Sequence, residues 1–140
     1  MKLLIVNGVN LALTGKREPS VYGARTLDEI NAGLKAFAKA HGHEADFFQS
    51  DIEGELCARL AQAEGKYDGI VLNAGAYTHY SYALRDAIAA ITVPVVEVHM
   101  SNVHAREEFR KKSVLTEVCR GEVLGFGEKS YYLAMESFWL

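Results

Sequence analysis

Short apolar runs alternate with helical patterns along the whole chain of 140 residues. The run at residues 69–72 is apolar without alternation, as expected of a strand whose two faces are both covered. Between the runs, apolar residues recur every three or four positions, which is the spacing of one face of a helix. The pattern predicts five strands, at residues 3–6, 45–48, 69–72, 94–98 and 123–126.

Local signals set the ends of the predicted helices. Thr26 followed by Glu29 is typical of a capping box, which satisfies the first backbone N–H groups of a helix. Ser50 or Asp51 is expected to cap the next helix, with Ile52 on its buried face. The predicted helices cover residues 27–41, 52–64, 80–90, 105–111 and 131–139.

The alternating order of strands and helices predicts an α/β fold, a parallel sheet with helices on both faces. Five strands in a doubly wound chain favour the flavodoxin-like order 2-1-3-4-5. The length suits one domain, and the composition, 49% hydrophobic and 24% charged, is that of an ordinary globular protein. We therefore expect a single domain spanning residues 1–140.

Charge and cysteine usage exclude several function classes. The formal net charge is −3, and no basic run is longer than residues 110–112, so a nucleic-acid partner is not expected. No apolar stretch approaches membrane-spanning length, and the N-terminal run is too short for a signal peptide. Cys57 and Cys119 form no metal-binding or redox spacing, which suits a reducing cytoplasm.

Polar residues follow three strands that neighbour one another in the predicted sheet. Ligands of such folds bind beyond the carboxyl ends of the strands. Asn10 follows the first strand, Asn73 and His79 follow the third, and His99 and Ser101 follow the fourth. Asparagine also serves as a turn former, which is its commonest use. The three strand ends together nevertheless predict one polar crevice for a small molecule.

The nineteen residues from Asn7 to Arg25 show no convincing helix or strand. A loop this long inside a compact domain is typically a lid or a binding loop. Arg17, Pro19 and Tyr22 would suit a lid, at about residues 15–25, that closes over an anion. Tyr22 taken alone would equally suit a simple loop anchor.

Two further features allow both a structural and a functional interpretation. Glu97 lies inside an apolar run. Either the strand is at an edge or wrongly predicted, or the Glu97 carboxylate is buried in order to orient His99. Arg106 and Arg110 would ordinarily form a solvated helix face, but they also suit anion binding at the crevice.

Known phosphate-binding motifs are missing. Gly8 and the Gly15-Lys16 pair are separated by too many residues for a P-loop, and no G-x-G-x-x-G follows a strand. No acidic cluster follows the first strand, which disfavours a phospho-receiver domain.

Six stretches of the sequence, taken together, are typical of one enzyme family. They are NGVNL from Asn7, REPSVYG from Arg17, QSDIEGEL from Gln49, NAGAYTH from Asn73, ALRDA from Ala83 and EVHMSNVHAREEFR from Glu97. With these motifs the chain resembles the type II 3-dehydroquinate dehydratases over essentially its full length. Departures such as Val9, Ala12 and Asp51-Ile52, where the family usually has proline, asparagine and Asn-His, leave the chemical residues intact.

The resemblance implies the dehydration of 3-dehydroquinate to 3-dehydroshikimate, a step of the shikimate pathway that leads to aromatic amino acids. It implies Tyr22 as the base that removes the C2 proton, supported by Arg17, and Asn10 as the holder of a water at the enolate. His99 would be the acid for the leaving hydroxyl, and Glu97 its orienting partner. The resemblance implies neither a metal nor another cofactor.

The resemblance also implies how the substrate is held and how subunits assemble. Arg106 would lie beside the site as a support. Asp86 would reach the site of a neighbouring subunit in a homododecamer built from trimers. The other positions that match substrate-binding residues are Asn73, His79, Met100, Ser101 and Arg110.

Two other functions fit the predicted fold. A flavin- or phosphate-binding module would share the architecture but needs a phosphate-cradling loop after the first strand. A non-catalytic oligomeric scaffold would have no use for Arg17, Tyr22 and His99 together. Enzyme catalysis on a small molecule therefore accounts for the most residues.

Overall fold

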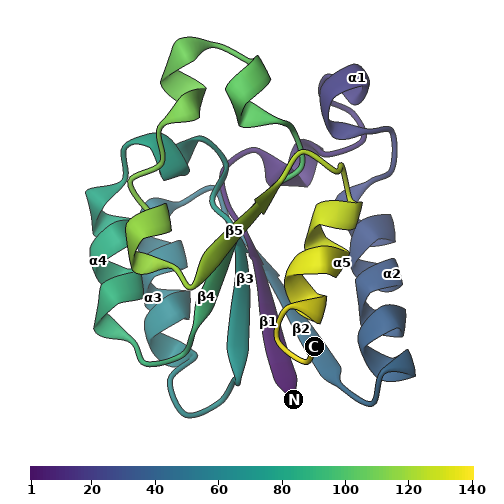
Figure 1. Cartoon of the computed structure of the whole chain (residues 1–140), viewed down its shortest axis with the longest axis vertical. Helices are drawn as coiled ribbons and strands as arrows, with labels where there is room; N and C mark the ends of the chain where they lie inside the picture. Colours follow the sequence, from purple (N-terminus) through teal and green to yellow (C-terminus); the bar gives the residue numbers. More distant parts are fainter.

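The computed structural model describes all 140 residues, which form a parallel β-sheet between two layers of helices (Figure 1). The sheet order is β2-β1-β3-β4-β5, and every neighbouring pair of strands is parallel. The predicted doubly wound, flavodoxin-like architecture is thus confirmed. The strands are β1 (Lys2–Asn7), β2 (Glu44–Gln49), β3 (Gly69–Asn73), β4 (Val95–His99) and β5 (Gly121–Leu124).

Helices α2 (Leu27–Ala40) and α5 (Lys129–Glu136) cover one face of the sheet, and α3 (Glu53–Gln62) and α4 (Tyr82–Ala90) cover the other (Figure 1). Each layer buries its own apolar cluster against the strands. None of the helices combines the length and apolar character needed to cross a bilayer. The short elements are α1 (Pro19–Tyr22) and the 3-10 turns η1 (Leu11–Leu13), η2 (Gly75–His79), η3 (Val103–Ala105), η4 (Glu108–Lys111) and η5 (Thr116–Val118).

The sequence of β1 has no alternation of apolar and polar residues because both faces of the strand are covered by helices. Leu3 and Ile5 pack beneath α2 and α5, whereas Leu4 and Val6 pack beneath α3 and α4. All four side chains are fully buried. Burying a side chain of this size typically contributes about 1.5–3 kcal/mol, so this central strand anchors both layers of the core.

The two predicted helix caps have different outcomes. The capping box of α2 is confirmed, because Thr26 Oγ1 accepts from the N–H of Glu29 and Glu29 Oε1 accepts from the N–H of Thr26. The predicted start of α3 is wrong: Ile52 is the N-cap residue, with 59% of its surface exposed. Ser50 instead accepts from the N–H of Ile52 and donates to Glu55, which organises the turn before the helix.

Short elements account for the other differences from the predicted structure. The segment between β1 and α2 contains the turns η1 and α1, which begin next to Asn10 and Glu18, both with positive φ. The predicted helix at residues 105–111 is instead the pair of turns η3 and η4. Strand β5 begins at Gly121, two residues earlier than predicted, and ends before Gly125, whose φ is 94°.

One buried phenol ties α5 to the carboxyl ends of two central strands. Tyr131, fully buried, donates its O–H to Asn7 Oδ1 at 2.5 Å and accepts from Asn73 Nδ2 at 2.8 Å. Asn7 and Asn73 are register partners at the ends of β1 and β3. Burial raises the pKa of Tyr131, so the phenol stays protonated and keeps donating.

We predict that Tyr131→Phe lowers the free energy of unfolding by about 2 kcal/mol, because both amides lose a partner that water cannot replace. Urea unfolding measures the change. Tyr132→Phe is the matched control, since that hydroxyl makes no hydrogen bond within the chain, and its effect should stay within about 0.5 kcal/mol. Equal stabilities of the two variants would contradict the structural role of the Tyr131 hydroxyl.

Candidate active site

A cavity lies at the carboxyl edge of the sheet, where β1, β3 and β4 end side by side. Its lining comes from the turns after these strands and from the long segment before α2. Ten of the twelve site residues predicted from the sequence line it; Glu97 lies behind His99, and Asp86 is exposed on α4. The ten are Asn10, Arg17, Tyr22, Asn73, His79, His99, Met100, Ser101, Arg106 and Arg110.

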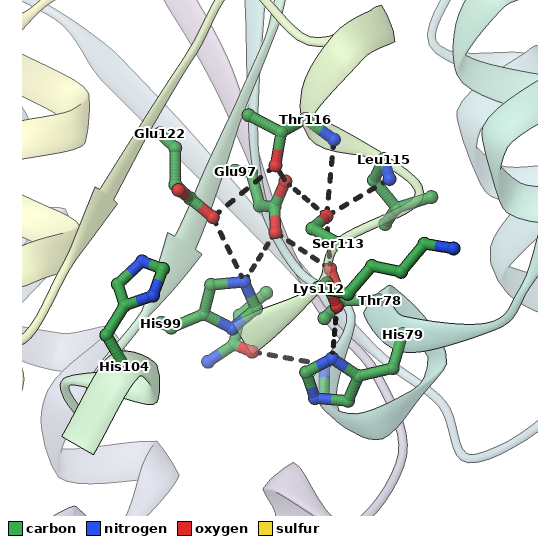
Figure 2. Close-up of polar contacts among 12 residues, drawn as sticks. Thr78, His79, Glu97, His99, His104, Lys112, Ser113, Leu115, Thr116 and Glu122 are labelled. Carbon is green, nitrogen blue, oxygen red and sulfur yellow. Dashed lines mark hydrogen bonds and ion pairs between the residues drawn. The ribbon is translucent and has the colours of Figure 1, made fainter. Parts of the chain in front are cut away.

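The carboxylate of Glu97 is completely buried and fully hydrogen-bonded (Figure 2). His99 Nε2 lies 2.5 Å from Glu97 Oε2, and Thr78 Oγ1 donates to the same oxygen at 2.8 Å. Ser113 and Thr116 donate to Oε1 at 3.0 and 2.7 Å. A carboxylate accepts about four hydrogen bonds, so its capacity is used.

These contacts decide the charge of Glu97. Burial alone would favour the neutral acid, but the bonds from His99, Thr116 and Thr78 outweigh it and hold the pKa of Glu97 well below its usual range. Glu97 is therefore an anion at neutral pH. Because Nε2 of His99 is bound to this anion, Nδ1 is the ring nitrogen left for a molecule in the cavity.

Three side chains here are of types that ligate metals. The ligand atoms of Glu97, His99 and Glu122 lie within 4.8 Å of one another. A cation among them would have to displace the protein donors that already fill Glu97. The arrangement therefore suits the holding and moving of protons better than the holding of a metal ion.

Tyr22 lies at the cavity in contact with two guanidinium groups. Arg106 Nη1 donates to the Tyr22 hydroxyl at 2.8 Å and also reaches Ser101 Oγ at 3.3 Å. The Arg17 guanidinium lies over the phenol ring, 5.0 Å from its centroid. Arg106, expected only beside the site, thus makes the direct contact with the hydroxyl, and Arg17 makes a cation–π contact.

Asn10 is held from outside the cavity by the loop after β2. Its backbone is left-handed, with φ at 67°, and its N–H donates to Asp51 Oδ1 at 2.9 Å. Gln49 braces the same turn by donating to Gly8 O and to Asp51 Oδ1. The Asp51 position, where the sequence departs from the resembled family, therefore supports a lining residue.

The polar side chains after β3 are also fixed by the protein. Asn73 is bound to Tyr131 and accepts from the N–H of Gly75. His79 Nδ1 lies 2.7 Å from the carbonyl oxygen of Lys112, and burial lowers the pKa of His79. His79 is thus expected to be neutral, donating through Nδ1 and leaving Nε2 for a ligand.

The sequence did not reveal the residues that surround Glu97. Thr78 lies in η2, and Ser113 and Thr116 lie at the start of η5; a hydroxyl residue in such a segment is too common to be a signal. Glu122 was outside the predicted fifth strand, because that strand was placed at residues 123–126. The true register pairs Glu122 with Glu97.

The architecture and the cavity together define an α/β protein with a cavity lined by a phenol, imidazoles and guanidinium groups at the carboxyl edge of its sheet. The family described as "Dehydroquinase class II" matches residues 1–139. The chain therefore belongs to the class II dehydroquinase family, whose members are hydro-lyases.

Relatives and solved structures agree with this membership. The chain is 57% identical to the 3-dehydroquinate dehydratase of Pelodictyon phaeoclathratiforme, over 98% of this chain and 91% of that protein. It is 56% identical to that of Bacillus licheniformis, over 97% and 94%. The crystal structure of type II dehydroquinase from Butyrivibrio crossotus superposes with a TM-score of 0.96 at 41% identity, covering 99% of this chain and 97% of that one.

We predict that Glu97→Gln lowers the free energy of unfolding by about 3 kcal/mol at pH 7, because removing one partner of a buried charged pair leaves donors unmatched. Since the pKa of Glu97 is lowered by folding, its contribution is present above the carboxyl's ordinary range and disappears as the pH falls below it. The difference from the unmodified protein should therefore shrink between pH 5 and about pH 3.

Urea unfolding at several pH values measures this difference. Glu44→Gln is the control, because Glu44 is exposed on the edge strand β2, away from Glu97, and the substitution changes the net charge equally. A difference that stays constant with pH would show that Glu97 is not the ionised partner.

Proposed function

We propose that this chain dehydrates 3-dehydroquinate to 3-dehydroshikimate, removing a proton from C2 and the hydroxyl group from C1 in a trans elimination through an enolate. The names of its relatives support the substrate. The observation that carries the proposed mechanism is that Tyr22 and His99, from distant parts of the chain, line one cavity. A phenol and an imidazole are the base and the acid that such a reaction needs.

Tyr22 is the proposed base. An ordinary tyrosine ionises only near pH 10, so a neutral-pH base of this type needs a cation close to its oxygen. Arg106 donates to that oxygen, and Arg17 lies over the ring. A phenolate formed at this position would therefore be in direct contact with two positively charged groups.

The C2 proton lies next to a ketone, so its removal produces an enolate. Asn10 is the proposed partner of that charge, holding a water molecule against the developing oxyanion. A donor fixed in advance is worth more than one that must reorient during the reaction. The hydrogen bond from the backbone N–H of Asn10 to Asp51 fixes the backbone from which this side chain projects.

His99 is the proposed acid. Hydroxide leaves poorly unless it is protonated as it departs, and general acid catalysis of this kind is typically worth about 10²–10⁴-fold. The buried anion of Glu97 occupies Nε2, so the proton to be donated is the one on Nδ1. Thr78, Ser113 and Thr116 keep Glu97 in place.

The substrate is a polyhydroxy keto-acid, and the rest of the lining suits it. Arg110 provides a positive charge for a carboxylate, and the amide and hydroxyl groups provide donors and acceptors for the ring hydroxyls. The proposed substrate-binding residues are Asn73, His79, Met100, Ser101 and Arg110, with Arg106 supporting Tyr22.

Residues 15–25 are proposed to act as a lid on the catalytic domain formed by residues 1–140. This segment carries both Arg17 and Tyr22, and most of its residues are exposed or half-exposed. Closure over a bound substrate would expel water and strengthen the electrostatic contacts around the phenol.

Asp86 is proposed to serve the cavity of a neighbouring subunit in a homododecamer built from trimers. Its exposed position on α4, away from this chain's own cavity, is compatible with that role. An interface of this kind would place a residue of one chain at the site of the next.

We predict that Tyr22→Phe lowers kcat by at least about 10³-fold while the affinity for 3-dehydroquinate changes little, because only the proton acceptor is lost. The ultraviolet absorbance of the conjugated enone follows turnover, and calorimetry follows binding. Tyr80→Phe, on an exposed side chain outside the cavity, is the control. Retained turnover in Tyr22→Phe would rule out the phenol as the base.

We predict that Asp86→Asn and Tyr22→Phe, each nearly inactive alone, partly restore activity when the two chains are co-expressed. In randomly mixed assemblies, about one quarter of all sites would combine an intact Tyr22 from one chain with an intact Asp86 from its neighbour. Activity no higher than that of the separate variants would contradict the shared site.

A further inference from the structure

The edge strand β5 places a second carboxylate beside the Glu97–His99 pair (Figure 2). The register opposes Glu97 to Glu122 and His99 to Leu124. Because alternate residues of a strand point to the same face, Glu97, His99 and Glu122 project from one face of the sheet. Glu122 Oε2 lies 3.8 Å from His99 Nε2, and the Glu122 side chain is only 23% exposed.

The two carboxylates are in different environments. Glu97 receives four hydrogen bonds, whereas Glu122 has only a 3.5 Å contact from the Thr116 hydroxyl, which is already committed to Glu97. Partial burial and the neighbouring charge of Glu97 raise the pKa of Glu122 to about 7. Above neutral pH, Glu122 therefore becomes a second anion next to the imidazole.

Among the titratable groups beside Glu122, His99 is the one that can carry a positive charge next to it. The others are Glu97, which is already ionised, and the Cys119 thiol. Burial raises the pKa of Cys119 to about 12, so the thiol is neutral over the working range. An ionised carboxylate that accepts few hydrogen bonds favours the positively charged form of an adjacent imidazole over the neutral form.

We propose that Glu122 is a positioning residue that acts through His99, favouring the protonated imidazole and so preserving the acid of the reaction above neutral pH. This inference rests on the proposed function, in which His99 gives a proton to the leaving hydroxyl. Glu122 does not line the cavity, so it contributes no contact to the substrate. Glu122 instead affects the fraction of His99 imidazole rings that are protonated.

The test compares kcat and KM between pH 5.5 and 10 for the full chain and its Glu122→Gln variant. The alkaline fall of kcat should begin about one pH unit lower in Glu122→Gln, while KM stays within about twofold. Glu122→Asp keeps the charge farther from the ring and should lie between the two. Glu44→Gln on β2 has the same net charge as Glu122→Gln and should follow the unmodified protein.

A kcat profile of Glu122→Gln that overlays the unmodified protein, or that falls equally at every pH, would overturn the proposal, since a purely structural role lowers activity without moving the profile. NMR of the His99 ring in the ligand-free protein gives a readout that needs no turnover. Its titration midpoint should move to lower pH in Glu122→Gln, and an unmoved midpoint overturns the proposal. If the unmodified protein produces no enone, the proposed reaction fails and the NMR result still decides the role of Glu122.

Discussion

The site depends on a buried negative charge that is fully hydrogen-bonded. Glu97 lies in a central strand with no exposed surface, and an unpaired charge at such a position would be very costly. Its donors come from η2, from the end of β4 and from the segment that leads into η5. These segments are therefore tied together by one anion, and His99 is oriented as part of the same structure.

Patterns that repeat along the chain predicted most of the fold. The unbroken apolar residues of β1 and β3 identified strands covered on both faces, and Thr26 with Glu29 located the start of α2, because these signals are local. The short turns η3 and η4 and the start of α3 were missed. A one-turn element has too few apolar positions for periodicity, and the exposure of Ile52 is decided by tertiary packing.

The candidate site was predictable at the strand ends and much less so behind them. Asn10, Asn73 and His99 follow predicted strands, so topology alone brings them to one edge. The contact of Arg106 with Tyr22 joins residues 84 positions apart, and no sequence pattern encodes it. Glu97 and Glu122 are neighbours because of the register between β4 and β5. Placing the start of the fifth strand two residues too late leaves Glu122 outside the strand, so the pair is not predicted.

The hydrogen bond between Arg106 and Tyr22 has a direction that follows from the chemistry of the two groups. A guanidinium has no acceptor, so the phenol oxygen must accept, and its own hydrogen is left pointing elsewhere. No protein atom accepts that hydrogen within the chain. Tyr22 can therefore lose it without breaking an existing bond, and the oxygen that remains is already solvated on one side by a permanent cation.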